Sequence, residues 1–445
     1  MQADAAPLHV PVSKCSPAHV ERFSPGRRAV IAGLAASAVL ASAAARTAAT
    51  KRKFRNTLSV GTDTERILGR GVVFSDGTRN ATSVEGLQRL YLAHGSNEVY
   101  ARIGTRKSAG NSLEKGLARA RLAKAINLPL SPEIGLWETY GGMPNFEDWP
   151  EIRMSKPWDL MTVAEMIPIV RDFGTLVARR LLATGVRVSS WNLSGDEHGI
   201  GGLTIPFAGP FVRPASYRPP NGVDPAIGVV DPHAFEALPV SERISWYSTH
   251  LWPHTGRVLS ALAQGIRAVQ PEARFSTHIG SSPSPAYEPK LITAFFQAND
   301  AAGYRVDDLG ICFFPSSVEV PDDRLAAFKS SVTEACSALG RAMYIAEYAY
   351  PVGPVRLGSA ETQSADWGHP TAGYPLSARS QTEVTRELVA WGVRSGCISG
   401  IRQWAPDMVE GAWAPLSLFD LNGLEAVARP ALNAVAEGQR QASIA

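Results

Sequence analysis

The sequence is poor in cysteine. Only four cysteines occur among 445 residues, and Cys15 lies in an N-terminal stretch that we expect to be removed. The other three, Cys312, Cys336 and Cys397, are an odd number without close spacing. Disulfide frameworks and zinc knuckles need paired or closely spaced cysteines, so neither is expected. We predict three buried free thiols.

Motifs of several large functional classes are also missing. There is no Gly-x-Gly-x-x-Gly turn after the first expected strand, no phosphate loop and no Gly-x-Ser-x-Gly nucleophile elbow. His250 and His254 have the spacing of a zinc protease helix, but Leu251 stands where that motif requires glutamate. Basic patches with interleaved aromatic residues are lacking as well, so nucleic acid is not an expected partner. No metal and no cofactor are predicted.

Excess positive charge is confined to the beginning of the chain. Residues 1–53 hold eight Lys or Arg against two Asp or Glu, which leaves 36 basic and 39 acidic residues in the remainder. The formal net charge of +3 therefore comes from this start, and the rest is mildly acidic.

The basic start has the features of an export signal. Arg27 and Arg28 precede an uncharged, alanine-rich stretch over 29–45, in which 41–43 is a possible cleavage site. Paired arginines before a weakly apolar segment are typical of a twin-arginine signal peptide. We therefore predict a signal peptide over 1–45 and a bacterial protein exported to the periplasm or the medium. The alternative is a membrane anchor, although a span needs about 20 strongly apolar residues.

Strand-like and helix-like patterns alternate after a polar linker over 46–66. Helices are expected between most of the strands, several with a capping box, at Thr82 with Glu85, Thr162 with Glu165, and Ser380 with Glu383. Eight strands separated by helices predict an α/β fold, a single (β/α)8 barrel over 67–445. A doubly wound sheet is the main rival, but its glycine-rich turn is missing. The eight candidate strands are 71–75, 98–103, 128–136, 186–193, 274–278, 309–314, 343–348 and 398–404.

Two connections are long and irregular. They cover residues 199–246 and 351–377, after the fourth and seventh expected strands. In a (β/α)8 barrel these positions lie at the C-terminal ends of the strands, where active sites are built. Long loops without secondary structure are usually functional walls or lids.

Two glutamates lie within a few residues of the beginnings of these loops. Glu197 and Glu347 each follow a short apolar run, and a carboxylate at the end of a buried strand costs desolvation energy. Glycosidic bond hydrolysis needs one carboxylic acid to protonate the leaving oxygen and a second carboxylate on the opposite face of the sugar. We assign Glu197 as acid/base, because Asp196 and apolar walls would raise its pKa, and Glu347 as nucleophile. The competing interpretation is two structural ion-pair partners.

Seven segments between about residue 69 and 437 form an ordered series of motifs. They are 90–102, 191–199, Thr277-His278-Ile279, 310–315, Ala346-Glu347-Tyr348-Ala349-Tyr350-Pro351, Arg402-Gln403-Trp404-Ala405-Pro406 and 418–423. Their order resembles family 53 of the glycoside hydrolases, the endo-β-1,4-galactanases of clan A, and 191–199 resembles that family's Gly-Asn-Glu motif.

The resemblance implies catalysis by Glu197 and Glu347, and it points to further residues that would contact the sugar. Arg102 corresponds to the arginine of the family's second strand, His278 lies in the fifth strand, and Trp404 would lie beneath the sugar next to the cleaved bond. We expected Arg102 to help keep Glu347 ionised. Flat indoles stack on sugar rings, and the candidates near strand ends are Trp137, Trp149, Trp191, Trp367, Trp404 and Trp413.

Three positions depart from the family pattern. Asp196 replaces an asparagine that can donate to a sugar hydroxyl. Phe313-Phe314 replace a pair of tyrosines whose hydroxyl can contact the nucleophile. The His-Tyr-Ser-Asp motif of strand three is not visible around 133–138. We therefore expect sugar subsites that differ from those of a standard galactanase.

The expected function is retaining hydrolysis of a β-linked polysaccharide, most favourably β-1,4-galactan or arabinogalactan, by a monomer. The substrate-binding residues predicted are Arg102, Asp196, His278, Trp404 and Trp137. Two alternatives remain open. One is another clan A specificity, such as a β-glucanase, mannanase or arabinofuranosidase, and the other is a catalytically silent sugar-binding barrel.

Overall fold

The computed structural model describes residues 53–105, 110–136, 144–158, 161–193, 237–279, 289–316, 323–355 and 368–444. Eight parallel strands form one sheet in the order β1-β10-β9-β8-β7-β6-β5-β4. Their bounds are β1 Arg55–Thr57, β4 Val99–Ile103, β5 Leu130–Ile134, β6 Trp191–Leu193, β7 Phe275–Ile279, β8 Asp308–Phe313, β9 Met343–Tyr348 and β10 Ile398–Gln403.

The two ends of this sheet meet. The Asn97 amide donates to the Asn56 carbonyl at 2.9 Å. The Ser59 hydroxyl accepts from the Tyr100 amide at 3.2 Å and donates to the Tyr100 carbonyl at 3.1 Å. These bonds join the β1 side to the β4 side, so the predicted (β/α)8 barrel is confirmed.

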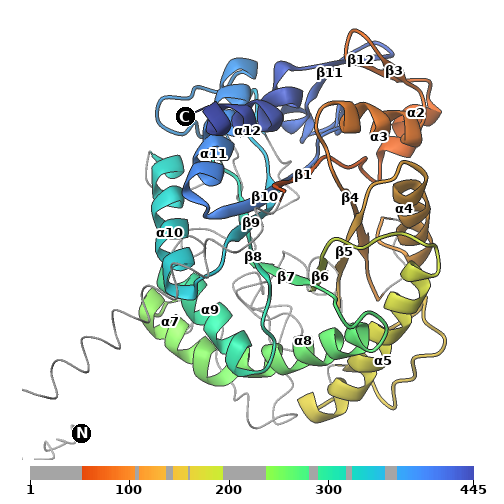
Figure 1. The fold of residues 1–445 in the computed structure, drawn as a ribbon, viewed down its shortest axis with the longest axis vertical. Coiled ribbons are helices and arrows are strands. Elements are labelled where there is room, and N and C mark those ends of the chain that lie inside the picture. Colours follow the sequence, from red (N-terminus) through yellow and green to blue (C-terminus); the bar gives the residue numbers. More distant parts are fainter. Residues whose placement is uncertain are drawn as a thin grey trace, which may run out of the picture. The chain divides into compact units, whose positions relative to one another are not determined.

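Helices surround the strands (Figure 1). The pair α5 and α8 shows how closely they pack, because a Cβ on Gly174 or Gly265 would lie within 2.4 Å or 2.0 Å of a backbone oxygen of the other helix. The helices are α2 Thr64–Gly69, α3 Val84–Ala93, α4 Leu113–Ala125, α5 Val163–Leu182, α7 Val240–Trp246, α8 Trp252–Arg267, α9 Pro289–Ala301, α10 Arg324–Leu339, α11 Ala378–Ser395 and α12 Ala434–Ile444. A π-helical turn, Tyr247–Leu251, joins α7 to α8, and 3₁₀ turns cover Ala414–Leu416 and Pro430–Asn433.

The first predicted strand was wrong. Residues 71–75 contain β2 (Val73–Ser75), which belongs to a separate four-stranded sheet in the order β11-β12-β2-β3. The other strands of that sheet are β3 (Asn80–Ala81), β11 (Phe419–Asn422) and β12 (Glu425–Ala428). The first barrel strand, β1, lies inside the predicted linker. Its three residues are polar, and Arg55 and Thr57 contact the buried carboxylate of Glu98, so no apolar run marks this strand.

Helix starts were only partly predicted. The capping box of Thr162 and Glu165 is present at the start of α5. The other two helices begin from different serines: Ser83 caps α3 and Ser377 caps α11. Ser83 accepts from the Gly86 amide, one position after the predicted Thr82, and Ser377 accepts from the amide of Ser380, which lies inside the first turn of α11.

A buried charged network forms the floor of the barrel. Arg55 at the start of β1 donates to Glu98 at 3.0 Å and lies 3.6 Å from Asp308 on β8. Its guanidinium is 4.1 Å from the ring centroid of Tyr344 on β9, and Thr57 bonds the same Glu98 carboxylate. Burial would raise the pKa of Glu98, but Arg55, Thr57 and Ser189 outweigh it and hold that pKa below its usual value. The floor is therefore a set of buried ion pairs near the N-terminal ends of the strands.

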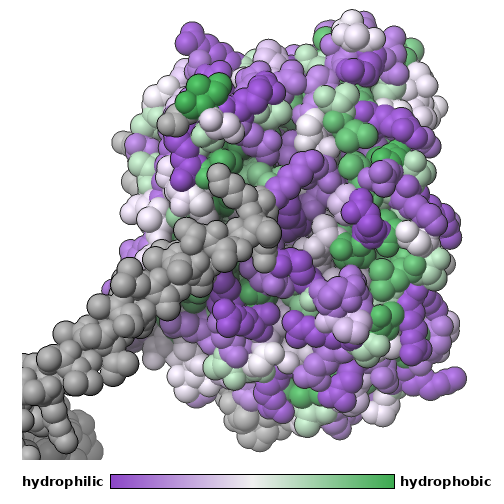
Figure 2. All heavy atoms as spheres, viewed as in Figure 1, coloured by the Kyte–Doolittle hydropathy of each residue, from purple (hydrophilic) through white to green (hydrophobic). Residues whose placement is uncertain are grey.

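The surface mixes polar and apolar side chains. Figure 2 shows hydrophilic residues over much of one face, with apolar ones scattered among them. Large exposed apolar residues in the described part are few, namely Leu92, Leu424, Val427 and Ile444. Among the described helices, none is long and apolar enough to cross a membrane.

Cys312 and Cys336 are buried thiols as predicted, whereas Cys397 is partly exposed.

Candidate active site

Arg402 on β10 is the centre of a buried cluster near the C-terminal ends of the strands. Its Nη2 donates to Oε1 of Glu347 on β9 at 2.8 Å, and its Nη1 donates to Oε2 of Glu133 on β5 at 3.3 Å. Its guanidinium carbon lies 3.8 Å from the ring centroid of Tyr100 on β4. Because β10 and β5 are not neighbours in the sheet, this contact crosses the interior of the barrel.

A β-bulge on β9 sets the position of Glu347. Ile311 of β8 pairs with Ile345, but the next pair is Cys312 with Glu347, so Ala346 is an extra residue on β9. The Ala346 carbonyl, displaced from that ladder, accepts from Nε of Arg402. Bulges re-aim side chains next to active sites. Here one guanidinium holds both the bulged backbone and the carboxylate that follows it.

The cluster keeps Arg402 charged. Burial opposes that charge, but Tyr100, Glu133 and Glu347 outweigh it and hold the pKa of Arg402 well above its usual value. Burial likewise raises the pKa of Tyr100 well above 10, so its hydroxyl stays protonated at neutral pH. Glu347 is 6% exposed and Glu133 is fully buried, so screening by water is weak around these ion pairs.

Arg102 pairs with Glu133. Its Nε lies 3.0 Å from Oε1 of Glu133, on the oxygen opposite to the one that Arg402 contacts. The Arg102 side chain is 17% exposed, whereas that of Arg402 is 5% exposed. Glu133 thus ties two guanidinium groups together, and Arg402 also donates directly to Glu347.

His278 on β7 joins the cluster through Asn192 on β6. Nδ2 of Asn192 lies 2.8 Å from Nδ1 of His278 and 3.5 Å from Oε2 of Glu133. An amide nitrogen facing a carboxylate is a donor, so Nδ1 of His278 accepts and the ring proton lies on Nε2. The hydrogen bond thus assigns the Nε2-protonated tautomer to His278, whose ring is fully buried.

Changing Asn192 to aspartate should reverse the His278 tautomer. A carboxylate at this position accepts instead of donating, so it favours a proton on Nδ1 of His278 and repels Glu133. We expect ¹⁵N spectra of the histidine ring to show the Nε2-protonated tautomer in the wild type and a protonated Nδ1 in Asn192→Asp. His278→Gln identifies the signal. Identical spectra in wild type and Asn192→Asp would refute the assigned hydrogen bond.

Aromatic side chains follow the ends of β8 and β10. The rings of Trp404 and Trp413 are 4.9 Å apart at 82°, and Phe314 packs against Trp404 at 5.9 Å and 86°. Both tryptophans are partly exposed. Ala405 has a φ of 53°, a left-handed conformation that is unfavourable for alanine and that turns the chain directly after Trp404. The site thus carries an aromatic corner beside the ion-pair cluster.

Comparison with solved structures identifies the architecture. A structure reported for two fungal β-1,4-galactanases aligns with a TM-score of 0.59 and 16% identity, over 86% of this chain and 99% of that chain. The catalytic domain of an Ignisphaera aggregans family 53 glycoside hydrolase aligns with a TM-score of 0.58 and 15% identity, over 86% and 96% of the two chains. The chain has a family 53-like fold. The sequence matches no protein-family model and no curated protein.

Four of the seven predicted catalytic and substrate-binding residues lie in the described part of the chain. Within this family 53-like barrel, Arg102, His278 and Glu347 lie in one buried network, and Trp404 lies beside it, at the end of β10. Glu197, Asp196 and Trp137 lie outside the described residues, as does Trp367. Trp149 and Trp191 are fully buried, so they belong to the core and are not sugar platforms.

Sequence reasoning missed several members of the cluster. It gave no role to Arg402, Glu133 or Asn192, and it treated Cys312 only as a small hydrophobe. The available signal was a charged or amide side chain inside a strand buried along its whole length, since such a group needs a partner in the barrel interior. Arg402 and Glu133 both fit that description.

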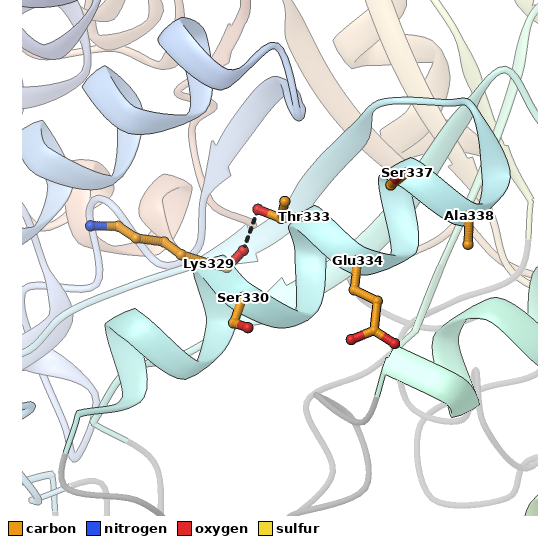
Figure 3. A pocket seen from close by; sticks show the side chains of 6 residues that line it. All are labelled: Lys329, Ser330, Thr333, Glu334, Ser337 and Ala338. Carbon is orange, nitrogen blue, oxygen red and sulfur yellow. Dashed lines mark hydrogen bonds between the residues drawn. The ribbon is translucent and has the colours of Figure 1, made fainter. Parts of the chain in front are cut away.

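A surface depression lies on α10, away from the ion-pair cluster (Figure 3). Six residues of this one helix line it, and Thr333 donates back to the Lys329 carbonyl at 2.7 Å. Lys329 pairs with Glu387 of α11, so its charge is already matched. The depression is lined by one helix only, whereas the cluster around Arg402 joins side chains from several strands, so the cluster is the better candidate site. Its lining residues are Lys329, Ser330, Thr333, Glu334, Ser337 and Ala338.

Proposed function

We propose that the protein is a retaining glycoside hydrolase that cleaves a β-linked polysaccharide, with β-1,4-galactan as the favoured substrate. One observation carries the proposal: Glu347, a buried carboxylate near the C-terminal end of a barrel strand, is held by Arg402 beside partly exposed tryptophans. This is the end of the barrel where enzymes of this fold build their sites. The family 53-like fold supports the choice of substrate, since the neighbours include β-1,4-galactanases.

The proposed reaction has two displacements. A carboxylate oxygen of Glu347 attacks the anomeric carbon while the glycosidic C–O bond breaks, and Glu197 gives its proton to the leaving oxygen. In the second displacement Glu197 takes a proton from a water molecule. The oxygen of that water attacks the anomeric carbon, the bond from this carbon to Glu347 breaks, and Glu347 is released as a carboxylate. Arg402 keeps Glu347 ionised and fixes its orientation before the attack. Glu197 enters this scheme as a proposal from the sequence.

The test is release of reducing sugar from purified β-1,4-galactan. Wild type should be active, whereas Glu347→Ala and Glu197→Ala should be inactive. Glu334→Ala is a matched control, because Glu334 is an exposed glutamate on α10 (Figure 3). A panel of arabinogalactan, β-glucan, mannan and arabinan distinguishes galactanase activity from the other clan A specificities. Activity on a different member of that panel would replace the substrate and keep the mechanism.

A silent sugar-binding barrel is the second candidate. It is favoured by the ion pair itself, because Glu347, Arg402 and Glu133 also form a complete structural network. Calorimetry with galacto-oligosaccharides separates the two. Binding by a wild-type protein that turns over no polysaccharide of the panel would support the silent barrel and reject the hydrolase.

We expect Trp404→Ala to raise KM for galactan about tenfold or more while kcat changes less. An indole stacked on a sugar contributes about 1–2 kcal/mol to binding, and 1.4 kcal/mol corresponds to a factor of ten. Steady-state kinetics with polysaccharide of defined length measures both constants. Trp391→Ala is the matched control, because Trp391 is also partly exposed but lies on α11. An unchanged KM in Trp404→Ala would place the sugar elsewhere.

Export fits this function. Polysaccharides are degraded where they occur, outside the cell, and the leader predicted over 1–45 would bring the enzyme there. Detection of the mature protein in the periplasm or medium, with loss of export in an Arg27→Lys/Arg28→Lys variant, tests the prediction.

A further inference from the structure

The second carboxylate oxygen of Glu347 faces a thiol. Sγ of Cys312 donates to Oε2 of Glu347 at 3.7 Å, and Cys312 is fully buried. The two residues are direct partners in the ladder between β8 and β9 only because of the bulge at Ala346. Without this extra residue, Cys312 would pair with Ala346 and the thiol would face a methyl group. The backbone irregularity therefore brings the thiol to the carboxylate.

The two residues directly after Cys312 carry no hydroxyl. Phe313 stacks on Phe328 of α10, with ring centroids 3.8 Å apart, so it points into the layer between sheet and helices. Phe314 packs against Trp404. From β8, the Cys312 thiol donates to Glu347.

We propose that Cys312 is a positioning residue for the nucleophile, which orients Glu347 from the side opposite to Arg402. Arg402 binds Oε1 through a strong charge-assisted bond, and Cys312 binds Oε2 through a weak one. The carboxylate is thereby held at both oxygens. This inference rests on the proposed function, because it assigns Cys312 a role in the reaction of Glu347.

Substitution by serine and by valine separates this role from simple packing. Serine keeps a donor, whereas valine keeps an apolar side chain suited to a strand. If Cys312 acts as a donor, Cys312→Val lowers kcat about three- to tenfold with little change in KM, and it moves the acidic limb of the kcat–pH profile to higher pH. Cys312→Ser then retains more activity than Cys312→Val and moves the limb to lower pH. If Cys312 is only a core hydrophobe, the order is reversed, because serine buries a polar group.

The hydrogen bond is also measurable without any activity. In a full-length Cys15→Ser/Cys336→Ala/Cys397→Ser variant, Cys312 is the single thiol. Its S–H stretching band in the infrared should move to higher wavenumber when Glu347→Ala is added, because the acceptor is lost. Glu334→Ala in the same background is the control and should leave the band in place.

The two measurements fail independently. A band that responds to Glu347→Ala in a protein without hydrolytic activity would keep the hydrogen bond and reject the proposed function. An active enzyme in which the band does not respond, or in which valine outperforms serine at position 312, would reject the role of Cys312 and leave the hydrolase proposal intact.

Discussion

Glu347→Gln is expected to lower kcat on β-1,4-galactan by about 10⁴-fold or more. Glutamine has nearly the same shape, but its amide is neither charged nor nucleophilic, so the glycosyl-enzyme cannot form. Arg402 would keep one acceptor, the amide oxygen, and the fold should persist. Steady-state release of reducing sugar measures the loss, and calorimetry with an oligosaccharide should show that binding remains.

Chemical rescue identifies the role more sharply than loss of activity. Azide is small enough to replace a missing carboxylate as nucleophile, so Glu347→Gly with azide should form a glycosyl azide of inverted configuration. Glu334→Gly provides the background, because this residue lies outside the barrel mouth. A Glu347→Gln enzyme that retained a tenth of wild-type kcat would exclude Glu347 as the nucleophile.

The fold was largely predictable because seven of the eight barrel strands carry apolar or β-branched runs. The range predicted for β9, 343–348, agrees with its observed bounds. The remaining strand, β1, reads Arg-Asn-Thr and could not be recognised from hydrophobicity. Its polar residues are satisfied by partners that lie far away in the sequence, such as Glu98 and Asp308. A local hydrophobicity pattern carries no information about such pairs. The segment that contains β2, rather than β1, was therefore predicted as the first barrel strand.

The site was predictable one residue at a time, but not as a network. Glu347 was found because a carboxylate at the end of an apolar strand is costly. The contact between Arg402 and Glu133 spans 269 positions, and the pairing of Cys312 with Glu347 depends on a bulge. An insertion of one residue changes the facing of every later side chain on a strand, and no sequence pattern marks it at Ala346. The hydrogen bonds from Cys312 and Arg402 to Glu347 therefore could not be predicted from the sequence.

Two charged layers are stacked inside the barrel. Arg55, Glu98 and Asp308 form the floor, and Arg402, Glu133 and Glu347 form the layer near the strand ends. Tyr344 connects them, since it lies against Arg55 and also contributes to the raised pKa of Arg402. Each guanidinium contacts two carboxylates, and Arg102 and Arg274 supply further positive charge to Glu133 and Asp308. Such a stack holds Glu347 in place before substrate arrives, which is the preorganisation that electrostatic catalysis requires.

Arg402→Met is expected to destabilise the protein by about 3–5 kcal/mol and to lower activity strongly. Methionine fills a similar volume but leaves Glu133 and Glu347 buried without their shared cation, and it releases the Ala346 carbonyl. Urea unfolding followed by tryptophan fluorescence measures the change. Arg379→Met is the control, because Arg379 makes an exposed i,i+4 pair with Glu383 that should contribute less than about 1 kcal/mol.

A double variant distinguishes loss of a cation from loss of packing. In Arg402→Met/Glu347→Leu the carboxylate of Glu347 is gone, and Glu133 keeps its ion pair with Arg102, so much of the lost stability should return while activity stays absent. Recovery of stability without activity means that the Arg402–Glu347 pair positions Glu347 rather than holding the barrel together. If the double variant is instead as unstable as Arg402→Met, the destabilisation comes from the bulged backbone that Arg402 supports at Ala346, and the electrostatic account of the cluster is wrong.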